Sequence, residues 1–166
     1  MADKEQVIKE QIKHSGLLDF PGVYSFAHSW FKEATYGVTE KKYSEKTDGN
    51  KKDLNIEWQA FRKISDYFKV EYKIKFEVIG LTDVEVEIDG QKKKMNKGNL
   101  TIDVTGTLIM DADNKWESSP FSRFMRDIYN KYIIPSRVNE TKGRIVNDVI
   151  TFKEQIKAFL DLTGRR

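Results

Sequence analysis

Few side chains in this 166-residue sequence have the types and spacing that catalysis or metal binding requires. His14 and His28 stand apart from each other, and there is no cysteine. A histidine-based hydrolytic or zinc site needs further ligands, or an orienting carboxylate, at defined spacing. We therefore expect both histidines to be structural or surface residues. The sequence predicts no metal, no cofactor, no disulfide and no cysteine nucleophile.

Other arrangements that could carry chemistry are incomplete. Asp111-Ala112-Asp113-Asn114 begins like a calcium loop, but Lys115 and Trp116 stand where an EF-hand needs an oxygen ligand and a glycine. No glycine-rich phosphate loop is present. Paired carboxylates would suffice for glycosidase-like chemistry, yet the candidates fall on predicted solvent-facing strand positions: Glu57, Glu71, Glu77, Glu85, Glu87 and Asp103. We expect no catalytic activity.

Two charged residues stand at even-numbered positions, which the apolar residues of their segment otherwise occupy. Arg62 and Asp66 are four residues apart, so they could meet on one helical turn. Because buried charges are costly unless they are paired, a structural ion pair is the ordinary interpretation. The alternative is that they anchor a ligand in a pocket together with Trp58 and Tyr72.

A run of three lysines, Lys92 to Lys94, follows Asp89-Gly90. Asp-Gly between two extended segments favours a type I′ turn, which would place Lys92 opposite Glu87 and Lys94 opposite Glu85. Cross-strand charge pairs of this kind explain the run without a ligand. Contact with an acidic or phosphate-bearing partner is the alternative.

Composition excludes broad classes without selecting one. Lys+Arg number 29 against 26 Asp+Glu, and 12% of residues are aromatic. The chain is long enough for one domain with a packed core, and we expect that domain to span residues 1–166. Opposite charges are interleaved along it, which argues against a nucleic-acid binder with a basic stripe. No segment has the length of an apolar membrane span, and we expect a cytoplasmic location.

Period-two alternation dominates the middle of the chain. Apolar residues alternate with charged ones over 67–79, which predicts a strand with one buried face. We expect another strand at Leu54 to Trp58, joined to it by an irregular corner, and a strand at Gly98 to Asp111 in which Gly106 marks a bulge, a bend or a close backbone approach. Val38 to Glu45 suits an edge strand. Val7 to His14 fits strand slightly better than helix.

Helical spacing brackets these strands. A helix is predicted to open at Pro21 and to end at Gly37, and a second to run from Ser119-Pro120 until Pro135 stops it. A third is predicted from Val146 to Leu162. The chain is therefore expected to be an α+β domain, with a curved antiparallel sheet of about five to six strands covered on one face by helices. This order of elements is similar to that of helix-grip (START-like) domains, a likeness of order alone.

Three functions remain open. The first is a non-catalytic binding or assembly subunit that acts through protein–protein contacts, by self-association or with a partner. Its candidate contact residues are aromatic side chains expected at the surface and the lysine run: Tyr36, Tyr43, Trp116, Phe152, Lys92, Lys93 and Lys94. The second is a carrier of a small apolar ligand, bound between the helices and the sheet at Trp58, Arg62, Asp66 and Tyr72. The third, a nucleic-acid-binding domain using Lys69, Lys73, Lys75 and the hairpin, is disfavoured because Glu71, Glu77, Glu85 and Glu87 would cancel its charge.

Overall fold

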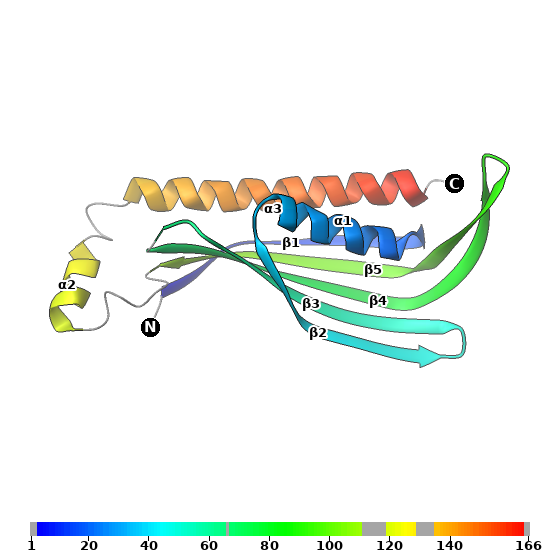
Figure 1. Cartoon of the computed structure of the whole chain (residues 1–166), viewed down its shortest axis with the longest axis horizontal. Helices are drawn as coiled ribbons and strands as arrows, with labels where there is room; N and C mark the ends of the chain where they lie inside the picture. The colour runs from blue at the N-terminus through cyan, green and yellow to red at the C-terminus, as the bar shows by residue number, and fades with distance from the viewer. Residues whose placement is uncertain (1–2, 66, 111–118, 129–134, 165–166) are drawn as a thin grey trace.

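Five antiparallel strands form one sheet, and two helices lie on one of its faces in a computed structural model of the chain (Figure 1). The structure describes residues 3–65, 67–110, 119–128 and 135–164. In these ranges the elements are β1 (Asp3–Leu18), α1 (Phe20–Glu33), β2 (Gly37–Asp48), β3 (Lys51–Lys63), β4 (Phe68–Ile88), β5 (Gln91–Met110), α2 (Pro120–Ile128) and α3 (Pro135–Gly164). The expected mixed α+β class with an antiparallel sheet is confirmed.

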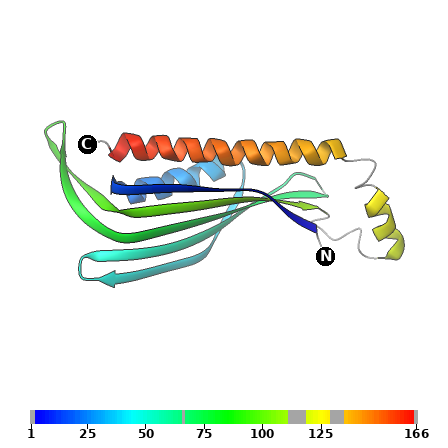
Figure 2. The same cartoon turned by 180° about the vertical axis from the view of Figure 1, so that it is seen from behind.

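The sheet order is β1-β5-β4-β3-β2. The first strand of the chain, β1, therefore forms one edge of the sheet and pairs with the last strand, β5. β2 forms the other edge, as its lysine-rich sequence predicts. β1 lies beside α3, which Figure 2 shows from behind. The face that carries α1 and α3 is called here the helix side, and the opposite face is called the outer face. α2 stands beyond one end of the sheet (Figure 1). None of the described helices is long and apolar enough to cross a membrane.

The predicted hairpin at Asp89-Gly90 is confirmed in detail. Both residues have positive φ, 51° and 79°, as a type I′ turn requires. Glu87 lies opposite Lys92 and Glu85 lies opposite Lys94, which is the predicted register. The two strands extend further than the alternation over 67–79 indicates, because β4 continues through a bulge to Ile88.

That bulge reverses the faces of β4. Gly80, with φ of 69°, and Leu81 together lie opposite Gly98 alone. A side chain on Gly98 would lie only 3.1 Å from the Leu81 Cα, so this close backbone approach requires glycine. Val84 and Val86, although they continue the even numbering of the core residues of β4, therefore lie on the other face. Beyond the bulge, Leu81 and Asp83 are on the helix side, and the hairpin bends towards that side (Figure 1).

The core fills the space between the sheet and the two covering helices. Its largest fully buried side chains come from every layer: Trp58, Tyr72, Phe31, Phe76, Phe152, Ile12, Leu18, Ile56, Ile74, Leu100, Ile102 and Leu108. Gly106 on β5 allows α3 to approach, since a Cβ there would lie 2.5 Å from Cγ2 of Ile145. Of the three alternatives for Gly106, a close approach is what the structure shows, and side chains of α3, β4 and β1 make it, not the backbone.

The helices differ from prediction at their ends. α1 begins at Phe20, capped by the Asp19 carboxylate, which accepts a hydrogen bond from the Gly22 amide at 3.2 Å. It ends at Glu33, before the predicted Gly37, and Thr35 follows with φ of 68°. α3 begins at Pro135 instead of Val146. Proline suits a first helical turn because its missing N–H would have no partner there, so Pro135 opens this helix. Residues 129–134 of the predicted second helix lie outside the described residues.

Candidate functional site

A groove on the helix side lies beside the amino-terminal half of α1. It is called here the α1 groove, and it encloses about 580 Å³. Phe20 and Tyr24 of α1 form one wall. Leu54, Ile56 and Leu81 supply an apolar floor from the sheet. The volume lies within the range of small-molecule sites.

Two irregularities of the sheet open this groove. The register between β2 and β3 shifts between Glu40 and Lys42, and Tyr43, beyond this shift, lines the groove together with Glu40. The Gly80 bulge turns the β4–β5 hairpin towards the helix side and brings Leu81 and Asp83 to the groove. The floor therefore extends beyond the part of the sheet that α1 covers.

Polar side chains at the rim of the α1 groove are engaged with one another. The Tyr24 hydroxyl donates to Glu40 at 3.0 Å, and Lys52 pairs with Glu45 at 3.4 Å. The Asn96 amide donates to Asp83 at 2.8 Å, while its carbonyl accepts from the Phe20 amide at 3.2 Å. Burial, followed by the hydrogen bond to Glu40, raises the pKa of Tyr24. These polar side chains of the rim therefore bind one another, whereas the floor is apolar.

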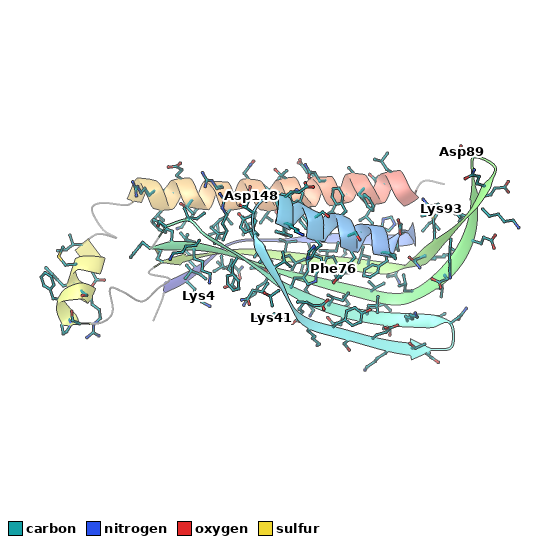
Figure 3. All side chains as sticks on the ribbon, in the orientation of Figure 1. Lys4, Lys41, Phe76, Asp89, Lys93 and Asp148 are labelled. Atoms are coloured by element: carbon teal, nitrogen blue, oxygen red, sulfur yellow. The ribbon has the colours of Figure 1, made fainter. Side chains whose placement is uncertain are left out.

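The ligand pocket predicted from sequence is filled with protein. Trp58 is 2% exposed and packs against Tyr24 and Phe76, at ring-centroid distances of 4.9 and 4.8 Å. Figure 3 labels Phe76 where the sheet passes beneath α1. Tyr72 is 1% exposed. Between the helices and the sheet, the space around Trp58 and Tyr72 is therefore occupied by aromatic side chains of α1, α3 and the sheet.

Tyr72 instead belongs to a buried polar cluster. The hydroxyls of Tyr36 and Tyr72 each donate to the Asp148 carboxylate of α3 at 3.1 Å, and they lie 3.4 Å from each other. Burial is the main cause that raises the pKa of both tyrosines, and the Asp148 carboxylate raises it further. The cluster ties the residue before β2, the first part of β4 and the half-buried Asp148 of α3 together at the edge of the core.

Arg62 and Asp66 are not described as a pair, because Asp66 lies outside the described residues. The Arg62 guanidinium is 5.9 Å from the centre of the Tyr36 ring and 3.5 Å from the carbonyl oxygen of Ala34. It therefore contacts the connection between α1 and β2.

The predicted contact residues divide into three groups. Tyr36 and Phe152 are 4% and 0% exposed, so the expectation that they lie at the surface is wrong for both. Tyr43 is 54% exposed and lines the α1 groove. Lys92, Lys93 and Lys94 are exposed near the hairpin tip, where Lys92 pairs with Glu85 and Lys94 with Asp83. Trp116 lies outside the described residues.

Sequence reasoning missed most of the α1 groove. Phe20, Glu40, Glu45, Asp83 and Asn96 come from α1, β2, β4 and β5, and no spacing along the chain relates them. The one available signal was Asp19-Phe20-Pro21, a helix start with an aromatic residue at its first position.

The histidines have ordinary surroundings. His14 lies 2.8 Å from the carbonyl oxygen of Leu17, and the ring of exposed His28 contacts Trp58 at 5.5 Å. In the part of the chain that the structure describes, no group of three or more histidine or acidic side chains is placed to hold a metal ion. No protein-family model matches the sequence, and a search of curated proteins finds no match.

Proposed function

We propose that the protein is a non-catalytic binding module that holds a small apolar ligand in the α1 groove. The observation that carries this proposal is the contrast between floor and rim. Leu54, Ile56 and Leu81 are only 6%, 0% and 8% exposed, so the apolar surface that a ligand would bury comes chiefly from Pro21, Tyr24 and Tyr43 above this floor. Burying such surface is favourable at about 25 cal/mol per Å². The rim carboxylates already have donors, so a ligand need not supply them.

The binding position differs from the one that the helix-grip likeness implies. In a helix-grip-like carrier the ligand would lie between the helices and the sheet, where this chain has its aromatic core. Here the available space is at the uncovered end of the same sheet face, between α1 and the β2–β3 hairpin. A ligand of modest size would contact α1 on one side and Tyr43 on the other.

A neutral fluorescent naphthylamine tests the proposal, because its emission rises on entering an apolar site. We expect saturable binding to the purified protein. Ser25 is exposed on α1 and lines the groove, so Ser25→Trp should fill it and weaken binding at least tenfold, about 1.4 kcal/mol. Ser15→Trp makes the same chemical change at an exposed site on the outer face and should leave binding unchanged. Absent binding, or equal loss in both variants, contradicts the proposal.

A second candidate function is self-association through α2. Phe121 is 71% exposed, Phe124 59% and Met125 39%, and the three recur at the spacing of one helix face. Exposed apolar patches of this kind mark contact surfaces, and identical patches on two copies can pair about a two-fold axis. Light scattering would detect a dimer in the wild type that Phe121→Ser/Phe124→Ser converts to monomer. A monomer at high protein concentration contradicts this candidate.

A further inference from the structure

The outer face of the sheet carries an excess of lysine that the linear sequence conceals. Strand alternation sends every second side chain to this face, and the antiparallel register aligns them in rows across the strands. One row is Lys9–Thr105–Lys73–Gln59–Thr39, and the next is Gln11–Asp103–Lys75–Glu57–Lys42. Neither α1 nor α3 covers this face (Figure 2).

Four of these lysines surround a shallow trough. Lys9 of β1, Lys41 of β2, and Lys73 and Lys75 of β4 line a concavity of about 450 Å³, together with Gln59, Thr105, Glu57 and Asp103. Lys41 reaches it because it is the extra residue of the β2 bulge. Figure 3 labels Lys4 and Lys41 on the side of the sheet away from α3.

The spacing of these cations follows from sheet geometry. Lys73 and Lys75 are two residues apart on one strand, which separates their Cα atoms by about 7 Å. Lys9 and Lys73 stand two strands apart in one row, about 10 Å. Successive backbone phosphates of a nucleic acid can meet cations at such intervals.

The acidic residues cancel this charge only in part, although Glu57, Glu77 and Asp103 do lie on the outer face. Glu71 is 2% exposed and lies 3.8 Å from Lys73 and 4.0 Å from Lys4, so its single negative charge is shared between two lysines. Glu85 and Glu87 lie on the helix side, because the Gly80 bulge reverses the faces of β4. The hairpin acids expected from sequence to neutralise Lys73 and Lys75 are therefore on the opposite face.

We propose that the outer face binds single-stranded nucleic acid through its phosphate backbone. Lysines supply the charge, and Thr105 and Gln59 supply neutral hydrogen-bond donors of the kind that contact phosphates. Phe61, the aromatic residue of this face in the described rows, is partly buried and lies beneath the Lys69 ammonium, 3.9 Å from its ring centre. None of these residues offers a free stacking platform, so binding rests on contacts to phosphates, which carry no sequence information.

An anionic membrane is the less favoured occupant. Stable attachment to a bilayer combines basic residues with apolar side chains that enter the acyl region. Ile109 of this face is only 5% exposed, and Phe61 is covered by Lys69. Ile79 of the same face is 51% exposed, but it is a single side chain that does not line the trough. The trough offers charge and hydrogen bonds without an apolar group to insert.

Fluorescence anisotropy with a labelled mixed-sequence single-stranded DNA tests the proposal. Neutralising four phosphates should give a slope of log Kobs against log salt of about −3, so affinity should fall roughly 50-fold between about 50 and 200 mM salt. Lys73→Gln/Lys75→Gln removes two of the four lysines. It should halve the slope and weaken binding at least tenfold at about 100 mM salt.

A matched control lies on the other face. Lys92→Gln/Lys94→Gln removes the same charge from the helix side of the hairpin and should change affinity less than twofold. If Lys73→Gln/Lys75→Gln disturbs folding by circular dichroism, Lys9→Gln/Lys41→Gln removes the two trough lysines of the other strands and should give the same loss. Three results overturn the proposal: no binding at low salt, equal losses in the outer-face and hairpin variants, or binding to phosphatidylserine vesicles without binding to DNA.

Discussion

Substituting alanine for Gly106 is the sharpest test of how α3 sits on the sheet. The added Cβ would lie 2.5 Å from Ile145 Cγ2, 3.2 Å from a Tyr72 ring carbon and 3.3 Å from Ile8 Cγ2. Favourable carbon–carbon contacts fall at about 3.5–4.0 Å, so Ile145 must move by roughly 1 Å. Tyr72 and Ile8 close the other directions, and α3 must therefore shift away from β5.

The expected cost follows from these contacts. Overfilling a close-packed core costs about 1–3 kcal/mol, and the lower backbone entropy of the unfolded alanine chain returns about 0.4–1 kcal/mol. We expect Gly106→Ala to lower the free energy of unfolding by about 2 kcal/mol. In a chain of this length the melting temperature should fall by about 4–8 °C. Urea unfolding would measure the change directly.

A double-mutant cycle separates this clash from a general weakening of the strand. Ile145→Ala removes Cγ2 and alone costs about 2–5 kcal/mol, but combined with Gly106→Ala it should cost at least about 1 kcal/mol less than the sum of the single changes. Ile145→Val keeps Cγ2 and should show no such rescue. A Gly106→Ala loss below about 0.5 kcal/mol, or strict additivity in the alanine cycle, would refute the reasoning.

Further predictions concern the buried cluster and the bulge. Asp148→Ala leaves the hydroxyls of Tyr36 and Tyr72 without their shared acceptor and should cost about 1–3 kcal/mol in urea unfolding; an unchanged midpoint would show that the cluster adds no stability. Because burial raises the pKa of both tyrosines above the ordinary value of 10, the unfolded chain loses these protons first as pH rises. Their contribution is therefore complete below pH 10 and should be lost above it by about 1.4 kcal/mol per pH unit for each tyrosine, whereas Tyr72→Phe should lose stability less steeply in alkaline titrations. Gly80→Ala places a side chain at φ of 69° and should cost about 1–2 kcal/mol in thermal unfolding; a neutral effect would mean that the bulge has another conformation in solution.

The strands were predictable because their signals are local. Alternation over 67–79 places β4, and Asp89-Gly90 fixes both the turn and the pairing of Glu87 with Lys92. The first half of α3 was not predictable in this way, since residues 136–144 are mostly polar and only Val138 joins the core. That segment is positioned by tertiary contact with β1, including the pairing of Lys142 with Glu5 at 2.8 Å.

The site was less predictable than the fold. Counting aromatic residues suggested a surplus for the surface, but Tyr36 and Phe152 are both consumed by the core beside Phe31, at ring distances of 6.1 and 4.9 Å. The α1 groove depends on two bulges, each a single extra residue. An extra residue leaves the apolar pattern on either side intact, so the pattern alone does not say which face follows it.

Charge shows the same limit more strongly. In the linear sequence the charges are balanced: Lys73 and Lys75 are followed by Glu85 and Glu87. The sequence gives only their separation along the chain. In the fold, the face of the sheet on which a side chain lies decides which charges are close together. That face alternates from one residue to the next, and the bulge at Gly80 reverses the alternation in β4. A net charge of +3 can therefore coexist with a basic outer face and an acid-rimmed groove on the helix side. Alternation alone keeps Glu71 and Glu77 on the same face as Lys73 and Lys75, so it is the bulge at Gly80 that decides which acidic residues share a face with these lysines.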